Sequence, residues 1–384
     1  MMEKLLRCLL LAALALPAAG RAQVKIGFIN SMTGPEAPIG ENLTRGVELA
    51  VEDLKKKGID LQVIKQDDGG KQPNAMSAME QLAAGEEVAA VVGPYTSANA
   101  NAVSALAEQY KVPQVIPAAA KEEITRQGRT YVFRLNAPAR EYASALLEAV
   151  LALGKPKTMA ILSENTDFGV SGSKSARAYA EKKGIKVVLE EAYSKGSPDY
   201  RSTLLKVKNT NPDLVFMVSY VADAILLMRQ SREIGLSPQG FLGAGAGFAT
   251  VQFAGEKAIS NGVFSSSQWT PQVKWPGSKE FNERYIKAAG KSPTYHAATA
   301  YAAMMILGEE AAKAGGDREK LQKALETGSW DGVDGPVKFE DYEGYANQNK
   351  HQMLVEQVQD GKHVTVWPTE LASGKPIWPF PGWK

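Results

Sequence analysis

The chain has 384 residues, and its 44 lysines and arginines against 42 aspartates and glutamates give a formal net charge of +2. A balance this close to neutral leaves no electrostatic footprint for nucleic acid or an anionic membrane surface, so we expect neither partner. A chain of this length is expected to form two domains.

The first 22 residues, MMEKLLRCLLLAALALPAAGRA, have the order of a secretory signal peptide. Two basic residues precede an apolar run over residues 9–16, and Gly-Arg-Ala at 20–22 forms a small-x-small cleavage site. The run is too short to cross a membrane. Cys8 is the single cysteine and lacks the small preceding residue of a lipoprotein cysteine. We therefore expect an exported, soluble chain that starts near Gln23, without a disulfide or a lipid anchor.

The chain after the signal alternates short apolar runs with amphipathic segments, which predicts β-α-β units. The first series has predicted strands at 24–29, 61–64, 88–92 and 114–116, and predicted helices at 41–57, 74–84 and 97–110. After residues 136–138 a second series has strands at 158–162, 187–189 and 214–218, and helices at 140–153, 169–183, 200–209 and 222–234. The short turns predict parallel sheets covered by helices, and the restart predicts two similar lobes.

The last third of the chain is punctuated by proline and glycine. Predicted helices there cover residues 278–289, 295–314 and 318–326. The end of the chain, 352–358 and 363–366, is typical of a β-hairpin around Asp360-Gly361.

Residues 91–107, VVGPYTSANANAVSALA, carry the strongest indication of a binding site. A buried strand ends, Gly93-Pro94 turns the chain, and Thr96 and Ser97 stand where a helix takes its N-cap. Such a turn presents backbone N–H groups, a hydroxyl and the positive end of a helix dipole, which suit a carboxylate. The alternative is an ordinary capped helix, since serine and threonine are common caps.

Other turns that follow predicted strands carry hydroxyls, amides and aromatic rings. Ligands of open α/β sheets bind beyond the carboxyl ends of the strands, where these turns meet. The residues concerned are Ser31, Thr33, Ser97, Asn165, Asp167, Phe168, Ser219 and Tyr220. They predict the lining of a small-molecule site rather than a catalytic centre.

Recognisable catalytic and metal-binding motifs are missing from the sequence. His296, His351 and His363 have no metal-ligand spacing, and we expect each to be structural or superficial. The GAGAG segment fails the dinucleotide pattern because Phe248 takes the place of the third glycine. An S-x-x-K match at residues 171–174 lacks the partner motifs of that enzyme class. We expect no metal, no cofactor and no enzymatic activity.

Seven sequence pieces resemble the periplasmic leucine/isoleucine/valine-binding proteins, the receptors of ABC importers, across essentially all of the mature chain. They are VKIGFINSMTGP at 24–35, DDGG at 67–70, VVGPYTS at 91–97, QVIPAAA at 114–120, FRLNAP at 133–138, TDFG at 166–169 and DGVDGPVKF at 331–339. The resemblance implies a type I periplasmic-binding fold, in which two Rossmann-like α/β lobes, each a mostly parallel sheet flanked by helices, are joined by a three-crossover hinge and close on a ligand.

This resemblance also implies how the chain is divided. After the signal peptide at 1–22, it gives a first lobe of 23–138 plus 269–338 and a second lobe of 139–268 plus 339–384. Its crossovers are expected near residues 136–139, 265–270 and 338–344. It implies a monomer in the periplasm that works with a membrane permease.

Five residues correspond by this resemblance to ligand-binding positions of the family. The serine that holds the ligand carboxylate falls on Ser97, beside Thr96. A backbone carbonyl contact falls on Ala118, and aromatic walls from the second lobe fall on Phe168 and Tyr220. The Tyr220 hydroxyl is expected to be free to meet a polar substituent on a ligand ring.

Three further positions depart from the family pattern. The family's threonine falls on Ala120, its ammonium-binding glutamate on Gly245, and an aromatic ring of its first turn on Ile39. A buried ammonium without an acidic partner is costly, so the anion half of the site is expected to be kept and the cation half lost. The alternative is that Asp167 or Glu41 supplies the missing charge from a shifted position.

The function expected from these residues is that of a substrate-binding protein of an ABC importer. Its ligand would be a small hydrophobic carboxylate, either an aromatic or aliphatic acid or an amino acid. The alternatives are a branched-chain amino-acid receptor proper and a periplasmic ligand sensor without a transport role. A secreted α/β hydrolase is the remote alternative, and it lacks the G-x-S-x-G elbow that its nucleophile would need.

Overall fold

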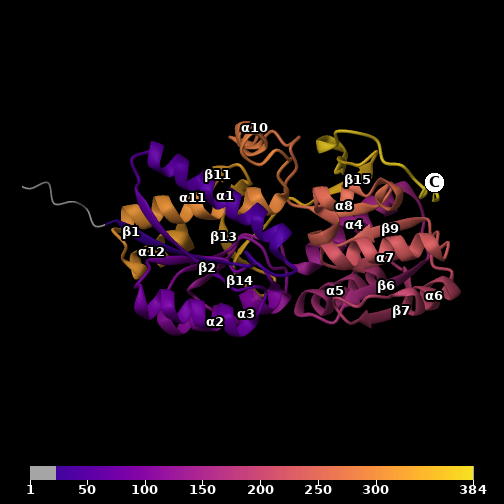
Figure 1. Cartoon of the computed structure of the whole chain (residues 1–384), viewed down its shortest axis with the longest axis horizontal. Coiled ribbons are helices and arrows are strands. Elements are labelled where there is room, and N and C mark those ends of the chain that lie inside the picture. Colours follow the sequence, from indigo (N-terminus) through magenta and orange to yellow (C-terminus); the bar gives the residue numbers. More distant parts are fainter. Residues whose placement is uncertain (1–22, 384) are drawn as a thin grey trace, which may run out of the picture.

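The computed structural model describes residues 23–383, which form two α/β lobes side by side along the long axis (Figure 1). The predicted signal peptide at residues 1–22 lies outside the described residues. Each lobe is built on one seven-stranded sheet, and a small two-stranded sheet stands apart from both. This architecture confirms the predicted fold class.

The first lobe has a sheet that is parallel except for one edge strand. Its strands are β1 (Val24–Asn30), β2 (Leu61–Asp67), β3 (Ala90–Val92), β4 (Gln114–Ile116), β5 (Val132–Arg134), β13 (Phe339–Tyr342) and β14 (Tyr345–Asn349). They are ordered β13-β14-β5-β4-β3-β1-β2, with β13 antiparallel to β14.

Helices cover both faces of this first sheet. They are α1 (Ala37–Lys56), α2 (Gln72–Glu80), η1 (Gln81–Gly85), α3 (Ser97–Tyr110), η2 (Glu122–Thr125), α10 (Ser278–Ala289), α11 (Tyr295–Ala314) and α12 (Arg318–Thr327). Helices α1 and α11 pack together on one face, and α2 and α3 cover the other (Figure 1). The small sheet of β11 (Trp330–Gly332) and β12 (Gly335–Val337) follows α12.

The second lobe also has one seven-stranded, mostly parallel sheet with helices on its faces, but its antiparallel strand lies one place in from the edge. Its strands are β6 (Thr158–Glu164), β7 (Lys186–Tyr193), β8 (Leu214–Val218), β9 (Gly240–Gly243), β10 (Phe264–Ser267), β15 (Leu354–Gln359) and β16 (Lys362–Trp367), ordered β16-β15-β10-β9-β8-β6-β7. Its helices are α4 (Ala139–Leu153), α5 (Asp167–Lys182), α6 (Arg201–Thr210), α7 (Val221–Glu233), η3 (Ala246–Ala249), α8 (Val251–Gly255), α9 (Lys257–Ser260) and η4 (Thr369–Leu371). Strands β15 and β16 form the predicted hairpin.

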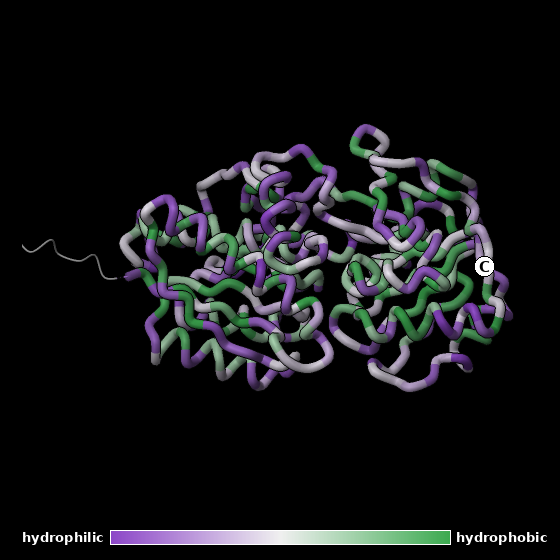
Figure 2. The backbone as a smooth tube through the Cα atoms, turned by 45° about the horizontal axis from the view of Figure 1, so that its top comes forward, coloured by the Kyte–Doolittle hydropathy of each residue, from purple (hydrophilic) through white to green (hydrophobic). Residues whose placement is uncertain are grey.

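Apolar periodicity explains why these segments fold as they do. Strand β8 is buried throughout, as expected of a central parallel strand with helices on both faces. Hydrophobic residues follow the strands through the interior of each lobe, while hydrophilic residues lie on the outer turns of the helices (Figure 2). The helix predicted from residue 41 begins earlier, at Ala37, because Pro38 fits the first turn of a helix. No helix within residues 23–383 is both long and apolar enough to cross a bilayer.

The third passage between the lobes lies later than the resemblance implies. Residues 339–349 were expected in the second lobe, but β13 and β14 extend the first sheet instead. Gln348 lies opposite Arg134 in the β14–β5 pair, and the ring of Phe339 meets that of Phe133 at 5.3 Å. The crossover therefore falls between Asn349 and Leu354, not at 338–344.

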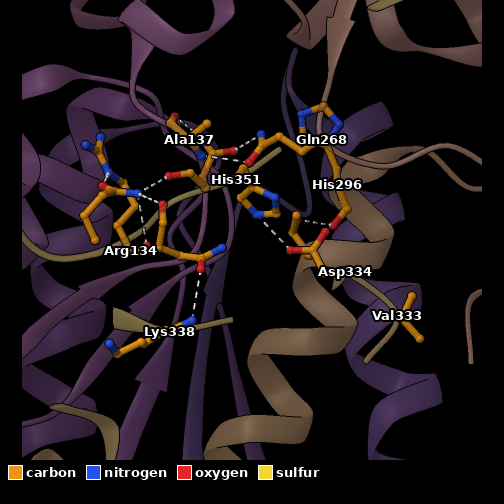
Figure 3. Close-up of polar contacts among 12 residues, drawn as sticks. Arg134, Ala137, Gln268, His296, Val333, Asp334, Lys338 and His351 are labelled. Carbon is orange, nitrogen blue, oxygen red and sulfur yellow. Dashed lines mark hydrogen bonds and ion pairs between the residues drawn. The ribbon is translucent and has the colours of Figure 1, made fainter. Parts of the chain in front are cut away.

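Side-chain amides tie the three passages together. Gln268 accepts the backbone N–H of Ala137 through Oε1 at 2.7 Å and donates through Nε2 to Asn136 Oδ1 at 2.7 Å (Figure 3). Gln348 donates to the carbonyl of Asn136 at 2.9 Å. In the third passage, His351 Nε2 lies 3.0 Å from the Asp334 carboxylate (Figure 3). These bonds fix the hinge beneath the cleft between the lobes.

Candidate ligand-binding site between the lobes

The turn from β3 into α3 forms one wall of the cleft. Thr96 has an extended backbone and caps the helix, because its Oγ1 accepts the N–H of Asn99 at 3.4 Å. Ser97 Oγ accepts the N–H groups of Ala120 at 3.2 Å and Lys121 at 3.3 Å. No acceptor for the Ser97 hydroxyl hydrogen is present among residues 23–383, so this group can donate to an anion at the start of α3.

Side chains from both lobes enclose a small pocket at this point. They are Tyr95, Ser97, Ala118, Ala119, Ala120, Asn136, Tyr295 and His296 from the first lobe or its hinge, and Tyr142, Phe168, Tyr220 and Ala246 from the second. The cavity volume is only about 20 Å³, space for roughly one water molecule. A larger ligand therefore requires the lobes to separate or the rings to move.

Aromatic rings fill most of the space in the pocket. Tyr220 lies 5.3 Å from Phe168 and 5.8 Å from Tyr95, measured between ring centroids, so rings of the two lobes meet. Tyr95 contacts His296 edge-on at 5.7 Å, and His296 stacks on Tyr295 at 3.9 Å. These faces and edges suit a flat, apolar ligand body.

Tyr220 stands at the N-cap of α7 and lines the pocket from the second lobe. Burial raises the pKa of Tyr220 well above its usual range, so the phenol remains neutral. The backbone N–H of Tyr220 in turn donates to the buried carboxyl of Glu164.

Neutral groups occupy the far side of the pocket, around Gly245. The Tyr142 hydroxyl donates to Asn136 Oδ1 at 3.0 Å and accepts from Gln268 Nε2 at 2.6 Å. The Tyr295 hydroxyl accepts the N–H of Ala246 at 3.2 Å. Burial raises the pKa of Tyr142 well above its usual range and that of Tyr295 to about 12, so both phenols stay uncharged.

Ion pairs join the lobes on two flanks of the pocket. Lys121 Nζ of the first lobe lies 2.7 Å from Asp167 Oδ2 of the second, beside a groove of about 720 Å³. On the other flank Lys195 pairs with the buried Glu36 and stands 4.8 Å from the ring centroid of Tyr220. The charges therefore hold the lobes together around a pocket whose own lining is uncharged.

Two alanines that line the pocket have strained backbone. Ala119 has a φ of 83° and Ala246 a φ of 43°, both in the left-handed region that alanine rarely occupies. Ala119 lies in the turn after β4 and Ala246 begins η3, so the two lobes contribute one each to the pocket lining. Such backbone geometry costs free energy, so the surrounding packing of both lobes must hold these two positions.

Residues 23–362 match a family model described as periplasmic binding protein. The chain belongs to the periplasmic binding protein family. It is 30% identical over 393 residues to the Leu/Ile/Val-binding protein homolog 7 of Brucella suis, covering 97% of this chain and 98% of that protein.

Solved structures with the same fold include two of different ligand classes. The leucine-binding protein LivK of Thermotoga maritima has a TM-score of 0.81 at 25% identity, covering 89% of this chain and 97% of that one. A solute-binding protein of an ABC transporter from R. palustris, solved with benzoate, has a TM-score of 0.80 at 20% identity, covering 90% of this chain and 95% of that one.

The structure of this periplasmic binding protein brings five of the eight expected site residues into the pocket lining. These are Ser97, Ala118, Ala120, Phe168 and Tyr220. Thr96 lies next to the pocket but serves as the helix cap. Ile39 is buried in the hydrophobic core of the first lobe and does not line the pocket, since its turn of α1 packs inward.

Gly245 also lies behind the lining rather than in it. Its φ is +63°, and a Cβ built there would stand 2.6 Å from Tyr142 Cε1 and 3.1 Å from the Tyr295 hydroxyl oxygen. The two tyrosine rings therefore take the space that a side chain at this position would need. A glutamate cannot be accommodated here without moving both rings.

Seven pocket residues were not predicted from the sequence: Tyr95, Ala119, Asn136, Tyr142, Ala246, Tyr295 and His296. Tyr95 lies between Gly93-Pro94 and Ser97, in the turn that the sequence already indicated as a binding site, so its position could have been predicted. Tyr295 and His296 are the first two residues of α11, and only the packing of that helix beside β3 brings them to the cleft. Burial lowers the pKa of His296 to about 3, so its imidazole is neutral.

Proposed function

We propose that this protein is the substrate-binding component of an ABC importer and binds a small hydrophobic carboxylate between its lobes. The observation that carries the proposal is the polarity of the pocket. One end offers the Ser97 hydroxyl and the start of α3, and the rest is aromatic and neutral. Within the proposal the protein has no catalytic role.

The proposed ligand class follows from which charged group the pocket can bind in place of water. A carboxylate gains the helix dipole and a hydroxyl donor at Ser97. An ammonium would lose its water and meet tyrosine hydroxyls already bonded to Asn136, Gln268 and Ala246. An aromatic or aliphatic acid is therefore expected to bind more tightly than an α-amino acid, and the benzoate complex of the R. palustris protein shows that this fold can hold such a ligand.

The two carboxylates considered as substitutes for the ammonium partner are already paired. Asp167 is bound to Lys121 at 2.7 Å, and Glu41 lies on the exposed side of α1 with Lys291 at 2.8 Å. Recruiting Asp167 would break a cross-lobe contact. This arrangement supports the acid over the amino acid.

A branched-chain amino-acid receptor is the second candidate. It is favoured by the name of the Brucella relative, which shares the full length of the chain. Mass spectrometry of small molecules released by denaturing the purified protein separates the candidates. Recovery of an organic acid supports the proposal, and recovery of leucine, isoleucine or valine supports the alternative.

Binding is proposed to work by bending at the three passages between the lobes. The pocket volume requires the lobes to open for entry, and the hinge amides lie directly beneath. We further propose that the mature protein is a periplasmic monomer that presents its closed form to a membrane permease. N-terminal sequencing of the exported protein tests cleavage before Gln23, and a lipid-modified or uncleaved terminus would contradict it.

A further inference from the structure

We propose that Tyr95 and His296 recognise a hydroxyl group on the ligand and so select hydroxylated aromatic acids over unsubstituted ones. The inference rests on the proposed function, because it assumes a carboxylate at Ser97. It adds a second polar contact, made by two residues that the family resemblance does not assign. The argument begins with the hydrogen-bonding state of each residue.

Tyr95 has a hydroxyl that lacks a partner. Its side chain is 4% exposed, and its oxygen is buried without a hydrogen bond to any residue in the range 23–383. Native proteins rarely leave a buried polar group unbonded, because its desolvation is then uncompensated. Burial raises the pKa of Tyr95 well above its usual range, so the group remains a neutral phenol that can donate. Since Tyr95 lines the pocket, a ligand atom is the natural acceptor.

His296 offers the complementary group. Thr294 Oγ1 donates to Asn42 Oδ1 at 3.4 Å and lies 3.3 Å from His296 Nδ1. With the single hydroxyl hydrogen of Thr294 given to Asn42, Nδ1 carries the imidazole hydrogen and donates to Thr294, and the proposal takes this tautomer. In this neutral tautomer Nε2 is an acceptor, and no residue within 23–383 donates to it.

A hydroxyl satisfies both residues at once. It can accept from Tyr95 and donate to His296, whereas an ether cannot donate and an ammonium cannot accept. The two rings meet edge-on with centroids 5.7 Å apart, and both line the pocket.

This pair and the carboxylate end of the pocket contact different elements of the first lobe. Ser97 Oγ faces the N–H groups of Ala120 and Lys121, which follow β4. Tyr95 instead contacts His296 at the start of α11. One ligand can therefore place its carboxylate at α3 and a ring hydroxyl at α11.

The test is calorimetric titration of protein stripped of bound ligand with benzoate, 3-hydroxybenzoate, 4-hydroxybenzoate and their methoxy analogues. One hydroxybenzoate should bind the native protein about tenfold more tightly than benzoate, as expected of one or two neutral hydrogen bonds. Its methoxy analogue should lose that advantage because it cannot donate to His296. In Tyr95→Phe the preference for the hydroxy acid should fall to about twofold or less.

Tyr200→Phe is the matched control, since Tyr200 is equally buried in the second lobe and its hydroxyl donates to Ser194 O outside the pocket. It should keep the native preference. If benzoate binds but no hydroxy acid is preferred, or if Tyr95→Phe keeps the preference, the inference is wrong and the proposed function stands. If no aromatic acid binds, the inference is wrong, while the proposed function fails only if aliphatic acids do not bind either.

Discussion

Ser97 Oγ lies 3.2 Å from the backbone nitrogen of Ala120, so the first residue of α3 is bound to the turn after β4. The oxygen accepts this N–H and that of Lys121, which leaves its own hydrogen to donate. The same side chain thus positions two elements and presents a donor at the end of a helix dipole. Both roles contribute to the consequence of removing it.

Ser97→Ala should weaken binding of an aromatic acid by about ten- to a hundredfold, since a hydrogen bond to a charged group contributes roughly 1.5–3 kcal/mol. The free energy of unfolding, measured in denaturant, should also fall. The reason is that the backbone N–H groups of Ala120 and Lys121 lose their acceptor. Ser104→Ala is the control in the same helix, with its Oγ bonded to Ala100 O at 2.6 Å. Equal ligand affinity in Ser97→Ala and Ser104→Ala would show that Ser97 has only a structural role.

Gly245→Ala should destabilise the protein more than Gly58→Ala. Both glycines have a φ in the left-handed region, +63° and +77°, so both variants bear backbone strain of about 1–2 kcal/mol. Only at Gly245 does the new Cβ meet Tyr142, and overpacking typically adds roughly 1–3 kcal/mol. Denaturant unfolding measures both. Equal losses would mean that Tyr142 moves aside freely and that the space behind the pocket is open.

Lys195→Met should weaken ligand binding by removing a contact of the closed form. Lys195 pairs with Glu36, which is 4% exposed. The substitution removes the ammonium group and leaves the buried Glu36 carboxylate next to the apolar methionine side chain. We expect a loss of about 1 kcal/mol, roughly fivefold in affinity. Lys206→Met is the control, because Lys206 pairs with Glu191 within the second lobe at 3.0 Å.

Solution scattering of the same variants separates closure from direct contact. The Lys195→Met protein should be more expanded than the native protein at equal, subsaturating ligand, and the Lys206→Met protein should not. An affinity loss with unchanged dimensions would place Lys195 in the binding contact rather than in closure.

The Glu164 carboxyl should make stability fall as pH rises. Burial raises its pKa from 4.5 to about 8, so the folded state holds a proton that the unfolded state releases. The stabilising contribution is complete below pH 4.5 and is lost as pH rises towards 8. In Glu164→Gln, whose amide oxygen can still accept the Tyr220 N–H, the unfolding free energy should fall less steeply between those pH values. Parallel pH profiles would show that Glu164 is ionised in the folded protein.

Local signals in the sequence were enough to predict α3 from Ser97 to Tyr110, because a strand, a Gly-Pro turn and a cap stand in order. They also predicted the hairpin of β15 and β16 from its Asp-Gly turn. The passage after Asn349 was misplaced because it depends on Gln348 pairing with Arg134, 214 residues away. No local pattern encodes such a contact.

The residues of the candidate site also fall into two groups, those that local sequence signals predicted and those that depend on packing between distant segments. Ser97, Phe168 and Tyr220 lie at the start of the helix that follows a strand, so strand positions alone placed them at the cleft. Tyr295 and His296 reach it through the packing of α11 beside α1 and β3. Gly245 was expected in the site because of its position along the chain. In the structure, Tyr142 of α4 fills the space that a side chain at position 245 would occupy.

The most direct test of the proposed function is calorimetric titration of protein stripped of carried-over ligand with four compounds: leucine, its keto acid, phenylacetate and 4-hydroxybenzoate. The neutral, aromatic pocket around Ser97 predicts that at least one of the three acids binds more tightly than leucine, because the amine gains no charged partner. Tightest binding of leucine by a clear margin would contradict the proposal and identify an amino-acid receptor.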